Sequence, residues 1–249
     1  MAIVEINGYT GAKTPDEILG SSNIIFYGDF TSTDNLVMSG SSVSRVNDKM
    51  GGTAYGQAQG FFSKLSVGTS GFLGWDPTTA SSVNNTYFRM YNLPSTNASN
   101  DTVIFIGELV SAGSVIVTQY GATSDNRGFK VTSSNNYQYP SSGTPRYYQT
   151  HNQSLAVGQT FATSSWAKTA SVNISNAESF IDGVKYPTLI TGSGTYNTYR
   201  WDAIGNGRNT GNSSSYSPFI HEIIYYNGKI TQAQWNDLMT LYVTPKYGV

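Results

Sequence analysis

The stretch FIHEIIYY at residues 219–226 is a run of apolar residues broken only by His221 and Glu222. The turn-forming pair Asn227-Gly228 follows it directly. A short apolar run bounded by turn residues is typical of a buried β-strand. The stretch therefore predicts a strand close to the carboxyl end of the chain.

An amphipathic helix is predicted immediately after this strand. Thr231 and Gln234 have the spacing of a capping box, which marks the start of a helix. Apolar residues then recur at i, i+3, i+4 and i+7, at Trp235, Leu238, Met239 and Tyr242. We expect this stripe to lie against the body of the domain. Pro245 should end the helix, because a proline disfavours the helical conformation in the preceding residue, Thr244.

Upstream of residue 219, short runs of strand-forming residues alternate with turn signals. Strands are predicted at residues 24–27, 87–91, 102–107, 114–120, 128–132, 165–173, 178–181, 184–189 and 199–204. Asp182-Gly183 predicts a tight hairpin turn, and Ala112-Gly113 predicts a hairpin between its flanking strands. Many short strands with frequent turns indicate a sandwich or barrel and not βαβ units. The predicted fold class is all-β, an antiparallel jelly-roll β-sandwich with a short C-terminal helix and an N-terminal arm.

The chain divides into an N-terminal arm, residues 1–22, and one jelly-roll domain, residues 23–249. A sandwich of this length is ordinary for a single domain. Within the arm, Thr14 can cap one helical turn, Pro15 suits its first position and Glu17 completes a capping box. The arm is either a surface lead-in to the first strand or an anchor to a larger assembly.

The chain carries few charges. Charged residues make up 12% of it, the formal net charge is -1, and no run of Lys or Arg is present. Binding to nucleic acid or to an anionic membrane surface is therefore not expected. The absence of cysteine excludes disulfides and thiolate chemistry. No apolar stretch approaches the ~20 residues that span a bilayer, and the N-terminus lacks the features of a secretory signal, so we expect folding in a cytoplasm.

One set of segments matches the motifs of a known superfamily, namely residues 25–30, 43–52, 59, 71–76, 179–184, 201–205 and 218–231. The C-terminal match is the most extensive, because it includes the strand, the helix cap and the tail Lys246-Tyr247-Gly248. Together these segments resemble the concanavalin A-like lectin/glucanase superfamily, in its laminin-G-like jelly-roll branch. The resemblance implies a concanavalin A-like sandwich of the kind found in bacteriophage virion surface proteins. Residues 120–165 match nothing in the family.

A catalytic carboxylate pair is not expected. Enzymes of the superfamily place their acids as Glu-x-Asp-x-x-Glu on one strand, and this chain has no such run. Glu108 and Glu222 stand alone on predicted strands, and we interpret them as structural carboxylates that are paired inside the fold. His151 and His221 lack neighbouring ligands at zinc spacing. No catalytic residues are therefore predicted.

No metal site or cofactor is predicted. Lectin-like folds often bind calcium through Asp, Asn and carbonyl oxygens in loops. Asp125-Asn126 and residues 202–206 could supply such oxygens, but their spacing is not that of a calcium loop.

A tyrosine-rich middle segment carries the predicted binding residues. A glycan site is predicted at Tyr137, Tyr139, Arg146, Tyr147 and Tyr148, because exposed tyrosine rings stack on sugar faces at a small entropic cost. The alternative is a long loop whose tyrosines pack on the sandwich.

The function predicted from the sequence is that of a non-enzymatic virion surface protein of a bacteriophage, used for adhesion or structural protection. It would be a capsid decoration or head-fibre protein, or a small tail receptor-binding protein. Such a protein folds in the host cytoplasm yet acts outside it. Its partners would be other virion proteins through residues 1–22, host cell-surface glycans, and further copies of itself. The alternatives are a carbohydrate-binding lectin module that acts in solution and a glycoside hydrolase of the glucanase branch.

Overall fold

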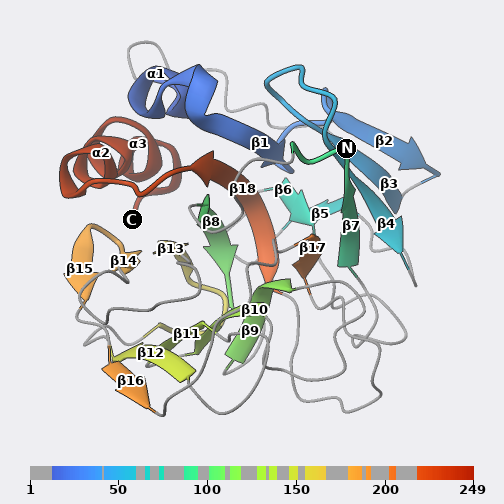
Figure 1. Cartoon of the computed structure of the whole chain (residues 1–249). Coiled ribbons are helices and arrows are strands. Elements are labelled where there is room, and N and C mark those ends of the chain that lie inside the picture. Colours follow the sequence, from blue (N-terminus) through green and yellow to red (C-terminus); the bar gives the residue numbers. More distant parts are fainter. Residues whose placement is uncertain are drawn as a thin grey trace.

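Two antiparallel β-sheets pack face to face in the computed structural model (Figure 1), which confirms the predicted all-β sandwich. The structure describes residues 13–40, 42–59, 65–67, 73–75, 87–94, 101–109, 113–118, 128–132, 135–138, 146–150, 155–166, 179–186, 189–191, 202–205 and 218–249.

Among these residues, one sheet has eight strands and the other has ten. The eight-stranded sheet has the order β15 (Val184–Tyr186), β14 (Ser179–Ile181), β13 (Thr160–Trp166), β8 (Asp101–Glu108), β18 (Phe219–Asn227), β6 (Leu73–Trp75) and β5 (Leu65–Val67), and β1 (Ile24–Asp29) also pairs with β18. The ten-stranded sheet has the order β16 (Leu189–Thr191), β12 (Arg146–Thr150), β11 (Asn135–Gln138), β10 (Gly128–Thr132), β9 (Gly113–Thr118), β17 (Ala203–Gly205), β7 (Tyr87–Tyr91), β4 (Tyr55–Gln59), β3 (Ser42–Asn47) and β2 (Leu36–Ser39).

The predicted strand at residues 219–226 is β18, which lies in the centre of the eight-stranded sheet. It pairs with β8 along one edge and with β1 and β6 along the other. Its pairing with β8 shifts between Ile220 and Glu222, so His221 is the extra residue of a β-bulge. A bulge interrupts the strict alternation of faces. Both His221 and Glu222 consequently contact the C-terminal helix, at Tyr247.

The eight-stranded sheet buries apolar side chains on both of its faces. One cluster fills the space between the two sheets and includes Phe26, Phe30, Phe88, Phe105 and Ile223. The second cluster lies under the helices and includes Tyr27, Ile104, Phe180, Trp235 and Leu238. This double burial explains why residues 102–107 and 219–226 are apolar without alternation.

The C-terminal helix starts where the sequence predicts. It comprises α2 (Gln232–Leu238), a π-helical turn η6 (Met239–Val243) and α3 (Thr244–Tyr247). The Thr231 backbone N–H donates to Gln234 Oε1 over 3.0 Å, and the Gln234 N–H donates to Thr231 Oγ1 over 3.2 Å, which confirms the capping box. The predicted stripe of Trp235, Leu238, Met239 and Tyr242 is buried.

The prediction that Pro245 ends this helix is wrong. Thr244 is helical, with φ -59° and ψ -48°, and the helix continues to Tyr247 before Gly248 closes it in the left-handed conformation. The π-helical turn widens the hydrogen-bond spacing ahead of the proline, and a proline is tolerated in the first turn of a helix because its missing N–H is not needed there. No helix in the described ranges is long and apolar enough to span a bilayer.

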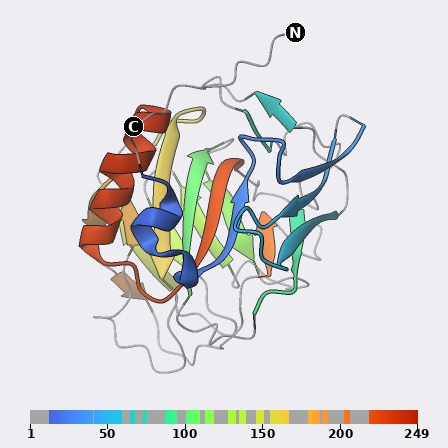
Figure 2. The same ribbon diagram turned by 90° about the horizontal axis from the view of Figure 1, so that it is seen from above.

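A short helix from the predicted arm packs beside the C-terminal helix on the same sheet (Figure 2). This helix is α1 (Pro15–Leu19), followed by a 3-10 turn η1 (Ser21–Asn23). The Thr14 N–H donates to Glu17 Oε2 over 2.8 Å, as the predicted capping box requires. Leu19 is buried in the cluster that contains Trp235. Residues 1–12 lie outside the described part of the chain, so an anchoring role of the arm stays a prediction.

Two of the predicted turns have different outcomes. Asp182 and Gly183 have φ of 42° and 86° and join β14 to β15, which confirms the tight hairpin. The predicted hairpin across Ala112-Gly113 is wrong, because β8 belongs to the eight-stranded sheet and β9 to the ten-stranded sheet. The chain crosses between the sheets there, and both flanking strands are apolar enough to suit either partner.

Candidate functional site

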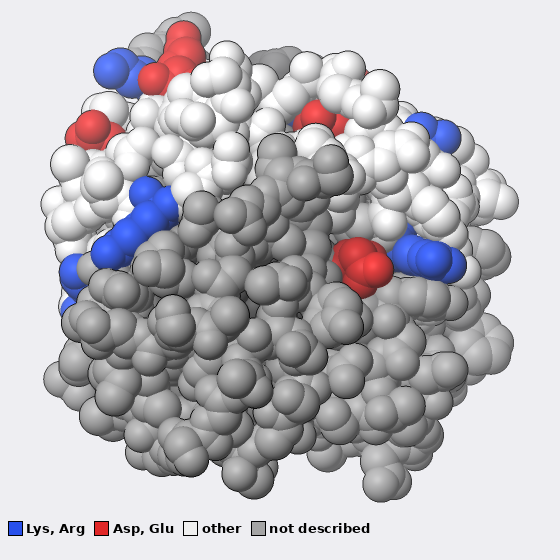
Figure 3. Space-filling model, in the orientation of Figure 1, with Lys and Arg blue, Asp and Glu red and all other residues white. Residues whose placement is uncertain are grey.

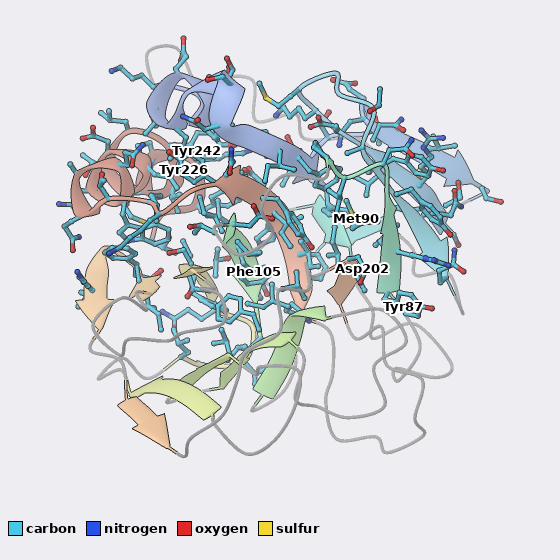
Figure 4. All side chains as sticks on the ribbon, in the orientation of Figure 1. Tyr87, Met90, Phe105, Asp202, Tyr226 and Tyr242 are labelled. Atoms are coloured by element: carbon cyan, nitrogen blue, oxygen red, sulfur yellow. The ribbon has the colours of Figure 1, made fainter. Side chains whose placement is uncertain are left out.

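The outer face of the ten-stranded sheet carries aromatic and cationic side chains where β3, β4 and β7 lie side by side. In β7, Phe88 and Met90 are buried between the two sheets. Because successive residues of a strand point to opposite faces, Tyr87, Arg89 and Tyr91 point away from the core, and all three are partly exposed. Figure 4 shows Tyr87 at the lower end of β7 and Met90 near its upper end.

The strand register brings five of these outer residues together. Tyr55 pairs with Tyr91, and Gln57 pairs with Arg45 on one side and with Arg89 on the other. The two tyrosine rings are stacked, with centroids 5.2 Å apart and planes 17° apart. The Arg45 guanidinium carbon lies 3.7 Å from the centroid of the Tyr55 ring. We call Arg45, Tyr55, Gln57, Arg89 and Tyr91 the β3–β4–β7 face.

The β3–β4–β7 face has the chemistry of a binding surface. Stacked aromatic rings provide large, rigid apolar area at a small entropic cost on binding. The Arg89 guanidinium carbon lies 5.1 Å from the Tyr91 ring, so both rings carry a cation–π contact. Gln57 donates through Nε2 to the Ser44 carbonyl over 2.8 Å, which fixes the orientation of its amide. The surface can therefore present the edges of the two rings to the apolar parts of a ligand and hydrogen-bond to its polar substituents.

A cleft of about 410 Å³ opens next to this face. It contains Ala54 and Asn92, which directly adjoin the stacked residues Tyr55 and Tyr91 in the sequence. Asn92 has a φ of 55°, in the left-handed region that asparagine tolerates better than most residues. The other polar side chains of the lining belong to Ser21, Ser22, Asp48, Thr53 and Asn227. The cleft thus extends the polar surface beyond the ends of β4 and β7.

Asp48 is the acidic residue in the wall of the cleft, and it has a structural role. Its Oδ1 accepts the backbone N–H groups of Tyr27 at 3.0 Å and Met50 at 3.1 Å. Its Oδ2 accepts the N–H of Gly52 at 3.1 Å. These bonds fasten the turn after β3 to β1. Within the described residues, no group of three or more His, Cys, Asp or Glu side chains is arranged to hold a metal ion.

Glu222 lies on the opposite side of the molecule from the β3–β4–β7 face, buried beneath the C-terminal helix. It accepts hydrogen bonds from Tyr27 Oη at 2.7 Å, Tyr242 Oη at 2.7 Å and Lys246 Nζ at 2.5 Å, and from the Tyr247 hydroxyl. Figure 4 shows Tyr242 above β18, next to Tyr226. Burial raises the pKa of Glu222, but the charge of Lys246 and the hydrogen bonds from Lys246, Tyr247 and Tyr242 outweigh it and lower the pKa to about 2. Glu222 is therefore an ionised structural carboxylate.

Two further buried carboxylates belong to the same sheet. Asp29 pairs with Glu222 across β1 and β18, and it accepts a hydrogen bond from Lys49 Nζ at 2.5 Å. Glu108 Oε1 lies 3.3 Å from His221 Nε2, and both side chains are buried. The predicted pairing of Glu108 and Glu222 inside the fold is confirmed by these contacts. Asp29 and Glu222 can lie side by side on adjacent strands because each is paired with its own lysine, Lys49 and Lys246.

The predicted glycan residues lie at the far end of the ten-stranded sheet from β3 and β4. Tyr137 is in β11 and pairs with Tyr148 of β12, and Tyr147 precedes Tyr148 on that strand. Arg146 is the first residue of β12, and its register partner is in β16. The segment thus forms paired strands where a loop had been considered. The side chains of these residues, Tyr139 as a whole, His151 and Asp125-Asn126 lie outside the described part of the structure, so this prediction is not tested.

The β3–β4–β7 face was not predicted from the sequence, although part of its signal was visible. The strand at residues 87–91 was predicted, and its pattern YFRMY alternates outer Tyr87, Arg89 and Tyr91 with inner Phe88 and Met90. A second alternation, YGQAQ at residues 55–59, went unrecognised because glycine and alanine occupy its inward positions. The pairing of Tyr55 with Tyr91 depends on register, which one sequence does not specify.

Comparisons with known proteins find similarity of fold. No protein-family model matches the chain, and no curated protein sequence matches it. The Trypanosoma rangeli sialidase in complex with sialic acid matches with a TM-score of 0.53 and 10% identity over 89% of this chain. Domain 4 of AbnA, an extracellular GH43 arabinanase from Geobacillus stearothermophilus, in complex with arabinotriose, matches with a TM-score of 0.51 and 16% identity over 88% of this chain.

The extent of these matches differs between the two proteins. This chain covers 98% of the arabinanase domain but only 33% of the sialidase chain, so it spans about a third of that enzyme. At such identities the likeness is one of fold, and fold alone does not give function. The chain has a β-sandwich fold that also occurs in carbohydrate-active proteins.

Proposed function

We propose that this chain is a carbohydrate-binding domain without catalytic activity of its own, and that its ligand binds on the β3–β4–β7 face. The observation that carries the proposal is the stacked, partly exposed pair of Tyr55 and Tyr91, with Arg45 lying on one ring. Sugar rings present apolar C–H faces to aromatic rings and hydroxyls to amide and guanidinium donors. The fold shared with the arabinanase domain, which is in complex with arabinotriose, supports the same function.

The distribution of acids supports binding over hydrolysis. A glycosidase of the usual kind needs two carboxylates that flank the scissile bond, about 5–5.5 Å apart for retention. The five residues of the β3–β4–β7 face include no carboxylate. The carboxylates of Asp29, Glu108 and Glu222 are buried in the other sheet and held by the groups described above. Charged side chains on the described surface in Figure 3 are scattered and do not gather around one hollow.

Alanine at Tyr55 or Tyr91 should weaken glycan binding by about 30-fold, because aromatic anchors at a binding site commonly contribute about 2 kcal/mol each. A glycan array of the unmodified chain would first identify a bound oligosaccharide, and titration calorimetry would then compare the variants. Val184→Ala is the matched control, since Val184 is exposed on β15 of the other sheet. Unchanged affinity in both tyrosine variants would refute the proposed site.

The tyrosines predicted from the sequence provide a rival site on the same sheet. If they bind the glycan, alanine at Tyr137 and Tyr148 should abolish binding while the Tyr55 variant keeps it. We expect instead that alanine at Tyr55 weakens binding and that alanine at Tyr137 or Tyr148 leaves it unchanged. Retained binding in the Tyr137 and Tyr148 variants would remove that surface from consideration.

The biological setting we propose is the surface of a phage virion, as a capsid decoration, head-fibre or tail receptor-binding protein. This proposal rests on the sequence resemblance described above and on the low charge of the chain, of which 12% is Asp, Glu, Lys and Arg. The two similar structures named above are an enzyme and a domain of an enzyme, so they do not bear on it. Mass spectrometry of purified particles should find the chain. Detection in the cell lysate alone would favour a lectin that acts in solution.

A further inference from the structure

We infer that the sugar bound on the β3–β4–β7 face is acidic, and that Arg45 binds its carboxylate. The inference rests on the proposed carbohydrate-binding function and names the class of ligand. It starts from the position of Arg45 in β3, where the side chain is only partly exposed. Arginine side chains that are removed from water are normally paired with an acid.

Arg45 has no such acid in the described part of the chain. The contact of its guanidinium is the one with the Tyr55 ring, 3.7 Å from carbon to centroid. Its Nε is buried and has no hydrogen-bond partner there. Lys49 and Lys246, in contrast, are each bound to a carboxylate, those of Asp29 and Glu222. Arg45 is thus a cation whose hydrogen-bonding capacity the described protein leaves unused.

The stack on Tyr55 also prepares Arg45 for an anion. The ring contact restrains the Arg45 guanidinium, so less conformational entropy is lost when a ligand binds. The donors of a guanidinium lie in one plane, and they match the two oxygens of a carboxylate. A sugar that lies against the exposed edges of the tyrosine pair would bring its substituents close to these donors.

The surrounding charges favour an anion as well. The β3–β4–β7 face contains two arginines, Arg45 and Arg89, and no acid. The carboxylate of nearby Asp48 is occupied by three backbone N–H groups. Asp202 precedes Ala203 in the sequence, and Ala203 of β17 pairs with Arg89 of β7. Because β17 and β3 lie on opposite sides of β7 and β4, Asp202 lies at the edge of the face away from Arg45. The positive charge available to a ligand is concentrated at Arg45.

Matched ligands test the inference on the unmodified full chain. Titration calorimetry would compare trigalacturonic acid with its methyl ester, and 3′-sialyllactose with its methyl ester, because the members of each pair differ only in whether the carboxylates are free or esterified. We expect the acidic member of at least one pair to bind about 10- to 100-fold more tightly, as charge-assisted hydrogen bonds predict. The preference should shrink at high salt.

Variants of Arg45 test whether this residue causes the preference for the acidic ligand. Arg45→Gln should remove the advantage of the acidic ligand, and Arg45→Lys, which keeps the charge but loses the planar fork, should keep only part of it. Lys13→Gln is the matched loss of charge at an exposed position before α1, and it should leave the preference unchanged.

The possible failures are distinguishable. Equal affinity within both pairs, or an acidic preference that survives Arg45→Gln, would overturn the inference and leave carbohydrate binding intact. Failure of the chain to bind any glycan on an array would overturn the proposed function and the inference together. The comparison of acid with ester needs no variant, so the test holds even if Arg45→Gln does not fold.

Discussion

Glu222→Gln is expected to lower the free energy of unfolding by about 3 kcal/mol at neutral pH, because it removes one partner of a buried ion pair. Glu222 is fully buried and accepts hydrogen bonds from three tyrosine hydroxyls and from Lys246. A neutral amide would leave Lys246 without its counterion and would present an N–H₂ group where the tyrosines donate. Urea denaturation followed by far-UV circular dichroism would measure the change.

Glu222→Gln should also remove the part of the pH dependence of the unfolding free energy that Glu222 contributes. The pKa of Glu222 is about 2 in the folded chain and 4.5 in the reference state. Its contribution is therefore complete above pH 4.5 and is lost as the pH falls toward 2, a total of about 3 kcal/mol. The difference in unfolding free energy between the original chain and the variant should shrink over this interval.

Asp237→Asn is the matched control, since Asp237 is exposed on α2. It should change the unfolding free energy by less than about 0.5 kcal/mol. A similarly small change for Glu222→Gln would show that the buried network contributes nothing and would contradict our interpretation of Glu222.

Trp235→Ala is expected to cost about 3–5 kcal/mol, the range for removing a buried aromatic side chain. Trp235 is fully buried and stacks on Phe180 of β14, with ring centroids 5.3 Å apart and planes 18° apart. It is the first residue of the stripe that holds the C-terminal helix on the eight-stranded sheet. Alanine would leave a cavity between α2 and β14. The midpoint of urea unfolding would report the loss.

Trp235→Phe distinguishes the effect of losing the aromatic ring from the effect of losing the indole N–H group. The indole Nε1 is buried and has no hydrogen-bond partner in the described residues, so phenylalanine removes an unsatisfied donor while keeping an aromatic ring against Phe180. We expect less than half of the alanine effect. Equal losses for the two variants would mean that ring stacking does not hold the helix.

The strand–helix unit at the carboxyl end could be predicted from the sequence because its signals are local. The run at residues 219–226, the capping box at Thr231 and the spacing of the apolar stripe each depend on neighbours within a few residues. The strands at residues 87–91 and 128–132 were predicted with the bounds that β7 and β10 have. The Asp182-Gly183 hairpin was predicted for the same reason.

Features that depend on tertiary context could not be predicted. A π-helical turn directly precedes the helical turn that contains Pro245, and the bulge at His221 arises from pairing with β8. Assigning β8 and β9 to different sheets requires knowledge of their partners. The stacking of Tyr55 on Tyr91 joins residues far apart in the sequence through register, which local patterns leave open.

The two sheets differ in what they carry, and the proposed binding face lies on the ten-stranded sheet. The eight-stranded sheet is covered by helices and holds Asp29 and Glu222 in ion pairs with lysines. The ten-stranded sheet presents partly exposed aromatic rings and Arg45, which has no acid partner among the described residues. Buried networks confer rigidity, and rigid sheets are better scaffolds for a site than loops are. The binding face is thus expected to keep its geometry when ligand binds.

Backbone amide chemical shifts, followed by NMR while a glycan that binds on the array is titrated into the chain, test the central claim most directly. The account predicts that the largest changes fall on residues 44–46, 54–58 and 87–92, which form the β3–β4–β7 face and the adjoining cleft wall. Changes centred on β8, β18 and the C-terminal helix would contradict it.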